Sequence, residues 1–259
     1  RLSPDVADLI EALQIEGTVS ILGPVVVDSL GEIDYTLIIR IKDATVRPRD
    51  HLAMLIGAPD SFWPRGLELT DVLIELDATK DRVEIRSCSA RAGAMRLSMT
   101  GTYHLEDPEL TSIDVRIDGA PVQERLLRLA SGDLRTTFED LYARWEPSGS
   151  MDLDVMVRGT GPGATTVRID AASMALRCGD ITERLRLVGG ALVVGGMSLT
   201  MEDLELDALS EGEQDGQYSL QGTMNWADEV VEADLRCQLV HGRFESPFLL
   251  DLAIAFAGE

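Results

Sequence analysis

The residues of this chain that could do chemistry are few and widely spaced. One glycine-rich run, Gly159–Gly163, has the composition of a phosphate-binding loop. It lacks the Lys-Ser/Thr pair of a P-loop, and an alternating strand pattern follows it where such a loop would open a helix. We therefore interpret this run as a turn between two strands.

The histidines and cysteines do not predict a metal centre either. His51, His104 and His241 form no i, i+4 pair, and no cysteine stands near them at a zinc-ligand spacing. The three cysteines, at positions 88, 178 and 237, are scattered and odd in number, so no disulfide framework is predicted. We expect buried free thiols, and no residue lies in a nucleophile-elbow context.

The densest carboxylate cluster comprises Glu202, Asp203, Glu205 and Asp207. In a regular strand the last three share one face, which makes a weak Ca²⁺ site conceivable, but no EF-hand pattern accompanies them. A solvated acidic face is the favoured interpretation. A glycosidase with paired carboxylates is a third possibility, although its acid and base cannot be singled out among 45 Asp and Glu residues. We predict no catalytic residue, no cofactor and no metal site, and thus no enzyme.

Composition limits the classes of partner. The 259 residues are 45% apolar but only 5% aromatic, so the core must consist mainly of aliphatic side chains and Met. The net charge of −22 argues against nucleic acid, because duplex binding needs a basic footprint. It also implies repulsion from an anionic membrane surface and a well-solvated outer face.

The chain contains an internal repeat of long period. Val6, Leu9, Ile10 and Leu13 match Phe138, Leu141, Tyr142 and Trp145 at a constant offset, and both sets have helical spacing. Later, Ser98–Thr102 matches Ser219–Thr223, and Asp114-Val115-Arg116 matches Asp234-Leu235-Arg236. We interpret this as a duplication, with a first unit at 1–132 and a second at 133–259. Ser131-Gly132 is the predicted boundary.

Alternating apolar and polar residues predict a mainly β fold. Short connections between the strands favour antiparallel meander pairing, because parallel crossovers need a dozen or more residues. Three short amphipathic helices are predicted at the unit junctions, over 4–13, 121–129 and 134–145. The predicted strands cover 16–27 (broken at Gly23-Pro24), 33–41, 67–76, 82–87, 95–103, 112–117, 151–158, 165–177, 185–188, 191–194, 198–206, 217–226 and 230–239, with a further element at 249–256.

Such strands have one apolar and one polar, mostly acidic face. The apolar face must be covered by helices, another sheet or a ligand, and three short helices are few for so many strands. The sheet could close on itself as a sandwich, or curve and leave an open apolar groove. The sequence does not decide between these two.

Several segments resemble the AsmA-like repeats of large bacterial envelope proteins, the group containing AsmA, TamB and YhdP. The resemblance rests on the run Ile113–Pro121 with the Leu-rich helix after it, and on the junction Trp145–Gly149 leading into the alternating strand Met151–Val155. The predicted strands that contain Gly101-Thr102 and Gly222-Thr223 show the pattern of such repeats as well. The resemblance covers most of the chain through spacing patterns and brings no catalytic residues with it.

The resemblance implies a long, twisted sheet with an apolar groove that conducts phospholipid between the two membranes of a diderm bacterium. It implies a location in the envelope or periplasm, with phospholipid acyl chains, the rest of a parent protein and membrane-anchored proteins as partners. The residues expected to line the groove by non-specific contact with acyl chains are Leu97, Met99, Ile113, Val115, Ile117, Leu153, Val155, Val157, Leu204, Leu206, Leu220, Met224 and Leu235.

No signal peptide, transit peptide or transmembrane stretch is visible in the sequence. We expect the chain to be an excised segment of a larger protein, with its anchor elsewhere. The alternative to lipid transport is a structural or adhesive tandem of β-sandwiches whose acidic surface binds a protein partner or Ca²⁺. For any one of the predicted lining residues, a place in a closed core is the competing interpretation.

Overall fold

A computed structural model describes residues 14–27, 29, 31, 33–47, 68–122, 142–143, 146–159, 163–170, 173–177, 184–210, 213–227 and 230–242. Most of these residues are in strands, which confirms the predicted mainly β class. The strands are β1 (Ile15–Leu22), β2 (Val25–Val27), β3 (Ile33–Val46), β4 (Leu69–Thr79), β5 (Arg82–Ala92), β6 (Met95–His104), β7 (Ser112–Pro121), β8 (Ser148–Arg158), β9 (Thr165–Asp170), β10 (Met174–Arg177), β11 (Arg184–Gly195), β12 (Ser198–Ser210), β13 (Glu213–Ala227) and β14 (Val230–Gly242). A 3₁₀ turn, η1 (Pro108–Leu110), precedes β7.

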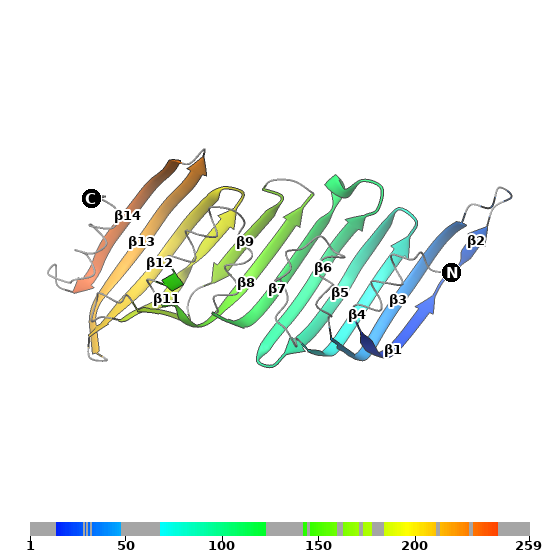
Figure 1. Cartoon of the computed structure of the whole chain (residues 1–259), viewed down its shortest axis with the longest axis horizontal. Helices are drawn as coiled ribbons and strands as arrows, with labels where there is room; N and C mark the ends of the chain where they lie inside the picture. The colour runs from blue at the N-terminus through cyan, green and yellow to red at the C-terminus, as the bar shows by residue number, and fades with distance from the viewer. Residues whose placement is uncertain are drawn as a thin grey trace. The chain divides into compact units, whose positions relative to one another are not determined.

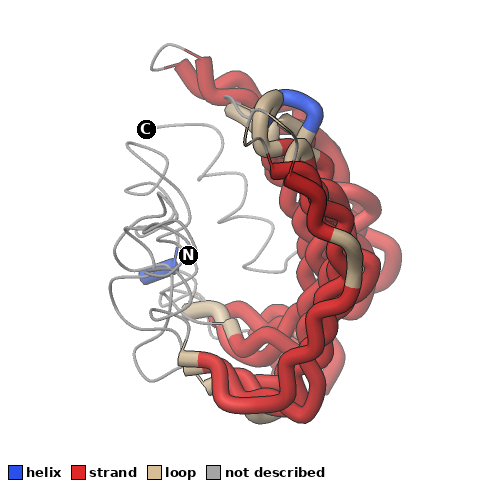
Figure 2. The backbone as a smooth tube through the Cα atoms, turned by 90° about the vertical axis from the view of Figure 1, so that its right-hand side faces the viewer, coloured by secondary structure: helices blue, strands red, loops and turns tan. Residues whose placement is uncertain are grey.

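The strands form an antiparallel meander, as predicted. They follow the order β1-β3-β4-β5-β6-β7-β8-β10-β11-β12-β13-β14, with β2 beside β3 and β9 beside β8 and β11 (Figure 1). Tight turns such as Gly93-Ala94 and Gly196-Met197 join neighbouring strands. Figure 2 shows the strands bending along their own length.

The structure corrects several predicted boundaries. Residues 165–177 form two strands, β9 and β10, rather than one. Residues 185–188 and 191–194 belong to the single strand β11, because Gly189 and Gly190 form an irregularity within it rather than a turn. Pro121, predicted to open a helix, is the last residue of β7. The three predicted helices, the Ser131-Gly132 boundary and the element at 249–256 lie almost entirely outside the described residues.

The chain divides into two compact units. Unit 1 comprises residues 1–119 and 154–165, and unit 2 comprises residues 120–153 and 166–259. The division passes through β8, so the first residues of that strand belong to unit 2 and the last to unit 1. Each unit has its own buried cluster.

The core of unit 1 lies on one face of its first strands. It consists of Ile41, Ala44, Val46, Val72 and Ala90, with Ile15, Leu69 and Ile74 packed against them. These residues come from β1, β3, β4 and β5, and several of them face one another directly across the strands. Small side chains at 44 and 90 allow the neighbouring aliphatic groups to approach closely.

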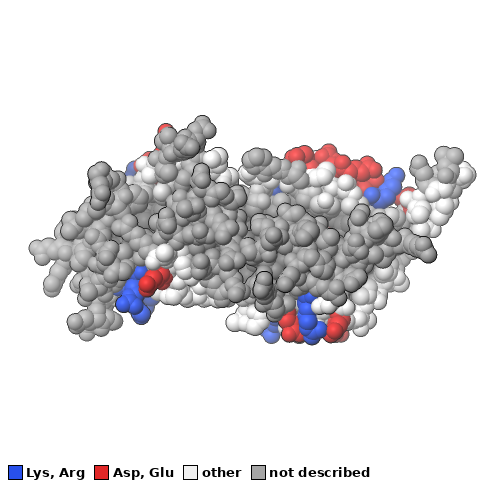
Figure 3. Space-filling model, viewed as in Figure 1, with Lys and Arg blue, Asp and Glu red and all other residues white. Residues whose placement is uncertain are grey.

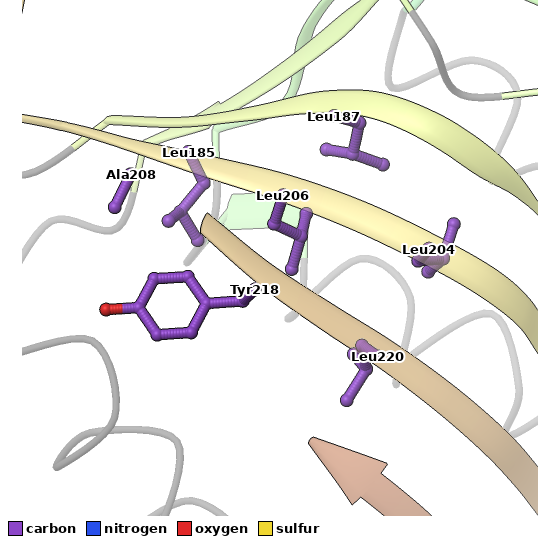
Figure 4. Packing of buried hydrophobic residues seen from close by; sticks show 7 residues of the cluster. All are labelled: Leu185, Leu187, Leu204, Leu206, Ala208, Tyr218 and Leu220. Carbon is purple, nitrogen blue, oxygen red and sulfur yellow. The ribbon is translucent and has the colours of Figure 1, made fainter. Parts of the chain in front are cut away.

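The core of unit 2 is formed by β11, β12 and β13. Its buried members are Leu185, Leu187, Leu204, Leu206, Ala208, Tyr218 and Leu220 (Figure 4). Leu206 lies between Leu187 on one neighbouring strand and Tyr218 on the other, and the Tyr218 side chain is fully buried. Cross-strand neighbours on one face supply most of the packing in a sheet, so this row stabilises the unit.

Candidate functional site

Of the glycine-rich run, the structure describes Gly159 and Gly163, which follow β8 and precede β9. Gly159 is buried, and its backbone N–H donates a hydrogen bond of 2.7 Å to the carbonyl oxygen of Thr111. That N–H is therefore engaged within unit 1 and is not available to bind a phosphate. Gly163 adopts a positive φ of 88°, which suits a turn, and the three residues between these glycines lie outside the described residues.

Two of the four carboxylates in the cluster on β12 pair with arginines. Glu202 pairs with Arg168, and Asp207 pairs with Arg186 at 2.6 Å. Asp203 lies at a bulge with φ 45°, so the regular face shared by Asp203, Glu205 and Asp207 does not form. Across the described residues, no group of three or more His, Cys, Asp or Glu side chains is placed to hold a metal ion.

The described cysteines differ in burial: Cys88 is buried, as predicted, whereas Cys237 is exposed, which corrects the prediction for that thiol. Burial raises the pKa of the Cys88 thiol, and desolvation also raises the pKa of the exposed Cys237. A raised pKa leaves less thiolate at neutral pH, so neither thiol is activated as a nucleophile. His104 is half-buried and His241 is exposed, whereas His51 and Cys178 lie outside the described residues.

An apolar face extends across the strands of unit 1. Strand register places one row of apolar residues directly opposite one another from β1 to β7, and a second row runs beside it. The first row is Val19, Ile41, Ile74, Cys88, Met99 and Val115. The second is Ile21, Ile39, Leu76, Ile85, Gly101 and Ile113. Leu97 and Ile117 face each other beside the first row, so this face is apolar over every one of these strands.

Unit 2 repeats this arrangement with rows of its own. One row runs through Ile169, Leu192, Met201, Gly222 and Leu235, and another through Val167, Val194, Leu199, Met224 and Ala233. Both continue the face that holds the buried cluster, since Leu192 and Met201 pack against it. Two predicted residues, Met224 and Leu235, thus belong to the same face as Leu206.

The predicted lining residues fall into two groups by burial. Four side chains are almost fully buried: Leu153, Leu204, Leu206 and Leu220. Nine are only half-buried: Leu97, Met99, Ile113, Val115, Ile117, Val155, Val157, Met224 and Leu235. The first group fits the interpretation of a closed core at those positions. The second group has apolar surface left to bury and is the better candidate for ligand contact.

Sequence reasoning missed several members of the apolar rows. Ile39, Ile74, Leu76 and Ile85 lie on the same face as Met99 and Val115 but were not among the predicted lining residues. Their strands alternate like the others, so alternation was a usable signal for them. Cys88 was assigned only as a buried thiol, and only the register reveals its place between Ile74 and Met99.

The opposite face of unit 1 contains cross-strand ion pairs. Arg40 and Glu75 approach to 2.9 Å between β3 and β4, and Arg158 pairs with Asp114 at 2.5 Å between β8 and β7. Hydrogen bonds to Glu16 and Glu68 raise the pKa of the Arg47 guanidinium above its ordinary value. On the face shown in Figure 3, the visible acidic and basic side chains lie towards the margins. These ion pairs therefore lie on the face of unit 1 opposite the apolar rows.

Among the described residues, no helix has both the length and the apolar character required to cross a membrane.

Comparison of the chain with protein-family models, with curated proteins and with solved structures found no match.

Proposed function

We propose that this chain is a non-enzymatic segment of an AsmA-like envelope protein that holds phospholipid acyl chains on its apolar face. In this role it contributes to phospholipid transport between membranes and to outer-membrane maintenance in the periplasm of a diderm bacterium. The observation that supports the proposal is the pair of apolar rows across unit 1, in which Met99, Ile113 and Val115 are only half-buried.

The physical basis is the gain from removing an acyl chain from water. Each methylene group that leaves water contributes about 0.8 kcal/mol, and this contribution needs no directional contact. Aliphatic side chains and Met can contact an acyl chain of any length at any position along the face, so a lipid can slide from strand to strand. Ion pairs on the opposite face keep that surface solvated and leave the apolar face as the surface available to lipid.

The proposal is tested by native mass spectrometry of the purified chain, with organic extraction of bound material. We expect phospholipid to bind the unmodified chain and to be lost from the Val115→Asp variant. A carboxylate at position 115 would be too costly to bury beside an acyl chain. Far-UV circular dichroism checks that the sheet still forms.

The matched control is Ser98→Asp, which adds the same charge next to β7 on the opposite face. Ser98 is exposed and lies across from Arg116, so the variant should keep its lipid. Purification can strip lipid, so a fluorescent phospholipid analogue is also added to the lipid-free protein. Absence of binding by that analogue, or equal loss in both variants, would contradict the proposal.

A further inference from the structure

Each unit places two arginines directly opposite each other on neighbouring strands. In unit 1, Arg91 of β5 faces Arg96 of β6, and in unit 2, Arg177 of β10 faces Arg184 of β11. All of these side chains are exposed. Like charges that face each other directly destabilise an antiparallel sheet, so each pair costs stability. The same unfavourable arrangement in both units favours a role for it other than folding.

Other arginines of the described strands lie beside a carboxylate on a neighbouring strand. Such ion pairs are Arg40–Glu75, Arg86–Asp77, Arg158–Asp114 and Arg168–Glu202. Because the chain has 45 acidic residues against 23 basic ones, a carboxylate is the charged neighbour that its composition makes commonest. The two arginine pairs depart from this arrangement.

The positive charge of these pairs is weakly compensated. Among the described residues, a carboxylate forms an ion pair with one arginine of the two pairs, Arg91, at 3.8 Å from Asp71. Both of those side chains are exposed, and an exposed ion pair of this kind contributes little. Asp118 faces Arg96 across β6 and β7 but pairs with Arg116 at 2.8 Å. The guanidinium groups therefore keep the capacity to bind an anion.

Two neighbouring guanidinium groups suit a phosphate ester. Each guanidinium presents parallel N–H donors that match two oxygens of one phosphate group. A phosphate placed between Arg91 and Arg96 accepts hydrogen bonds from both and offsets their mutual repulsion. The pairing that destabilises the free sheet thus becomes favourable once a phosphate is bound.

Each pair lies next to the apolar face of its unit. In unit 1, only Ala92, Met95 and the Gly93-Ala94 turn lie beyond Arg91 and Arg96 in the hairpin of β5 and β6. Ala92 and Met95 end the apolar face on that side. The aliphatic part of an arginine side chain can stay on the sheet while the guanidinium reaches the margin. In unit 2, the second pair borders the buried cluster through the adjacent residues of β10 and β11.

We infer that these arginine pairs hold the phosphate of a phospholipid whose acyl chains lie on the adjacent apolar face. The inference rests on the proposed function and adds the chemical group that is recognised, a phosphate ester. The opposite margin of unit 1 is unsuited to it, because the connection from β6 to β7 contains Glu106, Asp107 and Glu109, which repel phosphate. The phosphate in unit 1 therefore lies at the end of β5 and β6 that carries the Gly93-Ala94 turn.

The inference is tested with two fluorescent lipids that have the same acyl chains, phosphatidylcholine and diacylglycerol, which lacks the phosphate. Phosphatidylcholine has no net charge, so the net charge of the protein does not bias the comparison. The unmodified chain should bind phosphatidylcholine about tenfold more tightly than diacylglycerol, because of charge-assisted hydrogen bonds to the phosphate. In the double variant Arg96→Gln, Arg184→Gln, the affinity for phosphatidylcholine should fall to that for diacylglycerol, which should not change.

The matched control is the double variant Lys42→Gln, Arg236→Gln. It removes the same charge, one group from each unit, at exposed positions that face Thr18 and Gln221 rather than another arginine. This variant should keep the preference for phosphatidylcholine. Equal affinities of the unmodified chain for the two lipids, a preference that survives Arg96→Gln, Arg184→Gln, or its equal loss in both double variants would overturn the inference. Lipid binding, and with it the proposed function, would still stand.

Inorganic phosphate separates a lipid site from a site for free phosphate. Excess phosphate should lower phosphatidylcholine binding only to the level of diacylglycerol, because the acyl chains remain on the apolar face. Phosphate binding that needs Arg96 and Arg184, without binding of either lipid, would assign the pairs to free phosphate and overturn both the inference and the proposed function. Absence of binding by phosphate and by both lipids would overturn both as well.

Discussion

Two glycines occupy matching positions in the two units. Gly101 and Gly222 both have φ +147°, and both lie opposite an aliphatic residue of the next strand. A Cβ at Gly101 would come within 2.2 Å of the carbonyl oxygen of Ser112, and one at Gly222 within 2.1 Å of that of Asp234. Only glycine allows the neighbouring backbone to approach so closely at this φ.

We therefore expect Gly101→Ala and Gly222→Ala each to lower the free energy of unfolding by about 2 kcal/mol or more, from backbone strain and the clash with the carbonyl. Urea denaturation followed by circular dichroism measures the change. Gly195→Ala is the control, since its φ is not positive and its Cβ would meet only the Thr166 side chain at 3.3 Å. Equal losses in all three variants would show that the close approach of the neighbouring backbone is not the cause.

These glycines also correct the sequence alignment of the two units. The sequence matched Leu235 to Val115, but Leu235 lies opposite Gly222 just as Ile113 lies opposite Gly101. The difference is two residues. An alternating pattern repeats every two residues, so a shift of two leaves every side chain on its predicted face. The sequence could therefore predict the face of each residue in these strands but not its neighbour across the strands.

At the scale of the strands, aspartates occupy three of the bulges. Asp43, Asp71 and Asp203 have φ of 50°, 52° and 45°, and each falls at a shift in register. Asp tolerates this left-handed conformation better than most residues. Each bulge inserts one residue, which bends the strand and keeps aliphatic residues on both sides of it on one face.

This role of aspartate predicts opposite effects for two substitutions at Asp43, whose side chain is exposed. Asp43→Val should lower the free energy of unfolding by about 1–2 kcal/mol, because a β-branched residue is strained at positive φ. Asp43→Gly should be tolerated. Thermal denaturation compares both variants with Asp34→Val. Asp34 is an exposed residue of β3 whose φ is not positive, so valine should not lower the stability there. Destabilisation by Asp34→Val but not by Asp43→Val would contradict this account.

The strands themselves were largely predictable, because alternation of apolar and polar residues is a local signal. The strands from β1 to β7 begin within a few residues of their predicted positions. The joins were not. Gly189-Gly190 has the composition of a turn, yet the register continues through it, since Gly190 packs against the backbone of Asp203. The half-buried state of Val115 and the burial of Leu206 depend on what covers each face, and alternation does not contain that information.

At the scale of the whole molecule, separation of charge and apolar surface combines with a large net charge. The ion pairs between strands neutralise some carboxylates locally, but 45 acidic residues against 23 basic ones leave the chain strongly negative. Under the proposed function, the chain must approach a bilayer to collect its lipid. The electrostatic field of the protein then affects the rate of that approach before any apolar contact is made.

We therefore expect the chain to extract lipid faster from zwitterionic vesicles than from anionic ones at low ionic strength, because like charges repel. The difference should shrink as salt is added, since the screening length falls from about 10 Å at 0.1 M to about 3 Å at 1 M. Transfer of a self-quenched fluorescent phospholipid from phosphatidylcholine and phosphatidylglycerol vesicles measures both rates. Equal rates at low salt would mean that the acidic surface turns away from the membrane during extraction, and a preference for anionic vesicles would contradict the prediction outright.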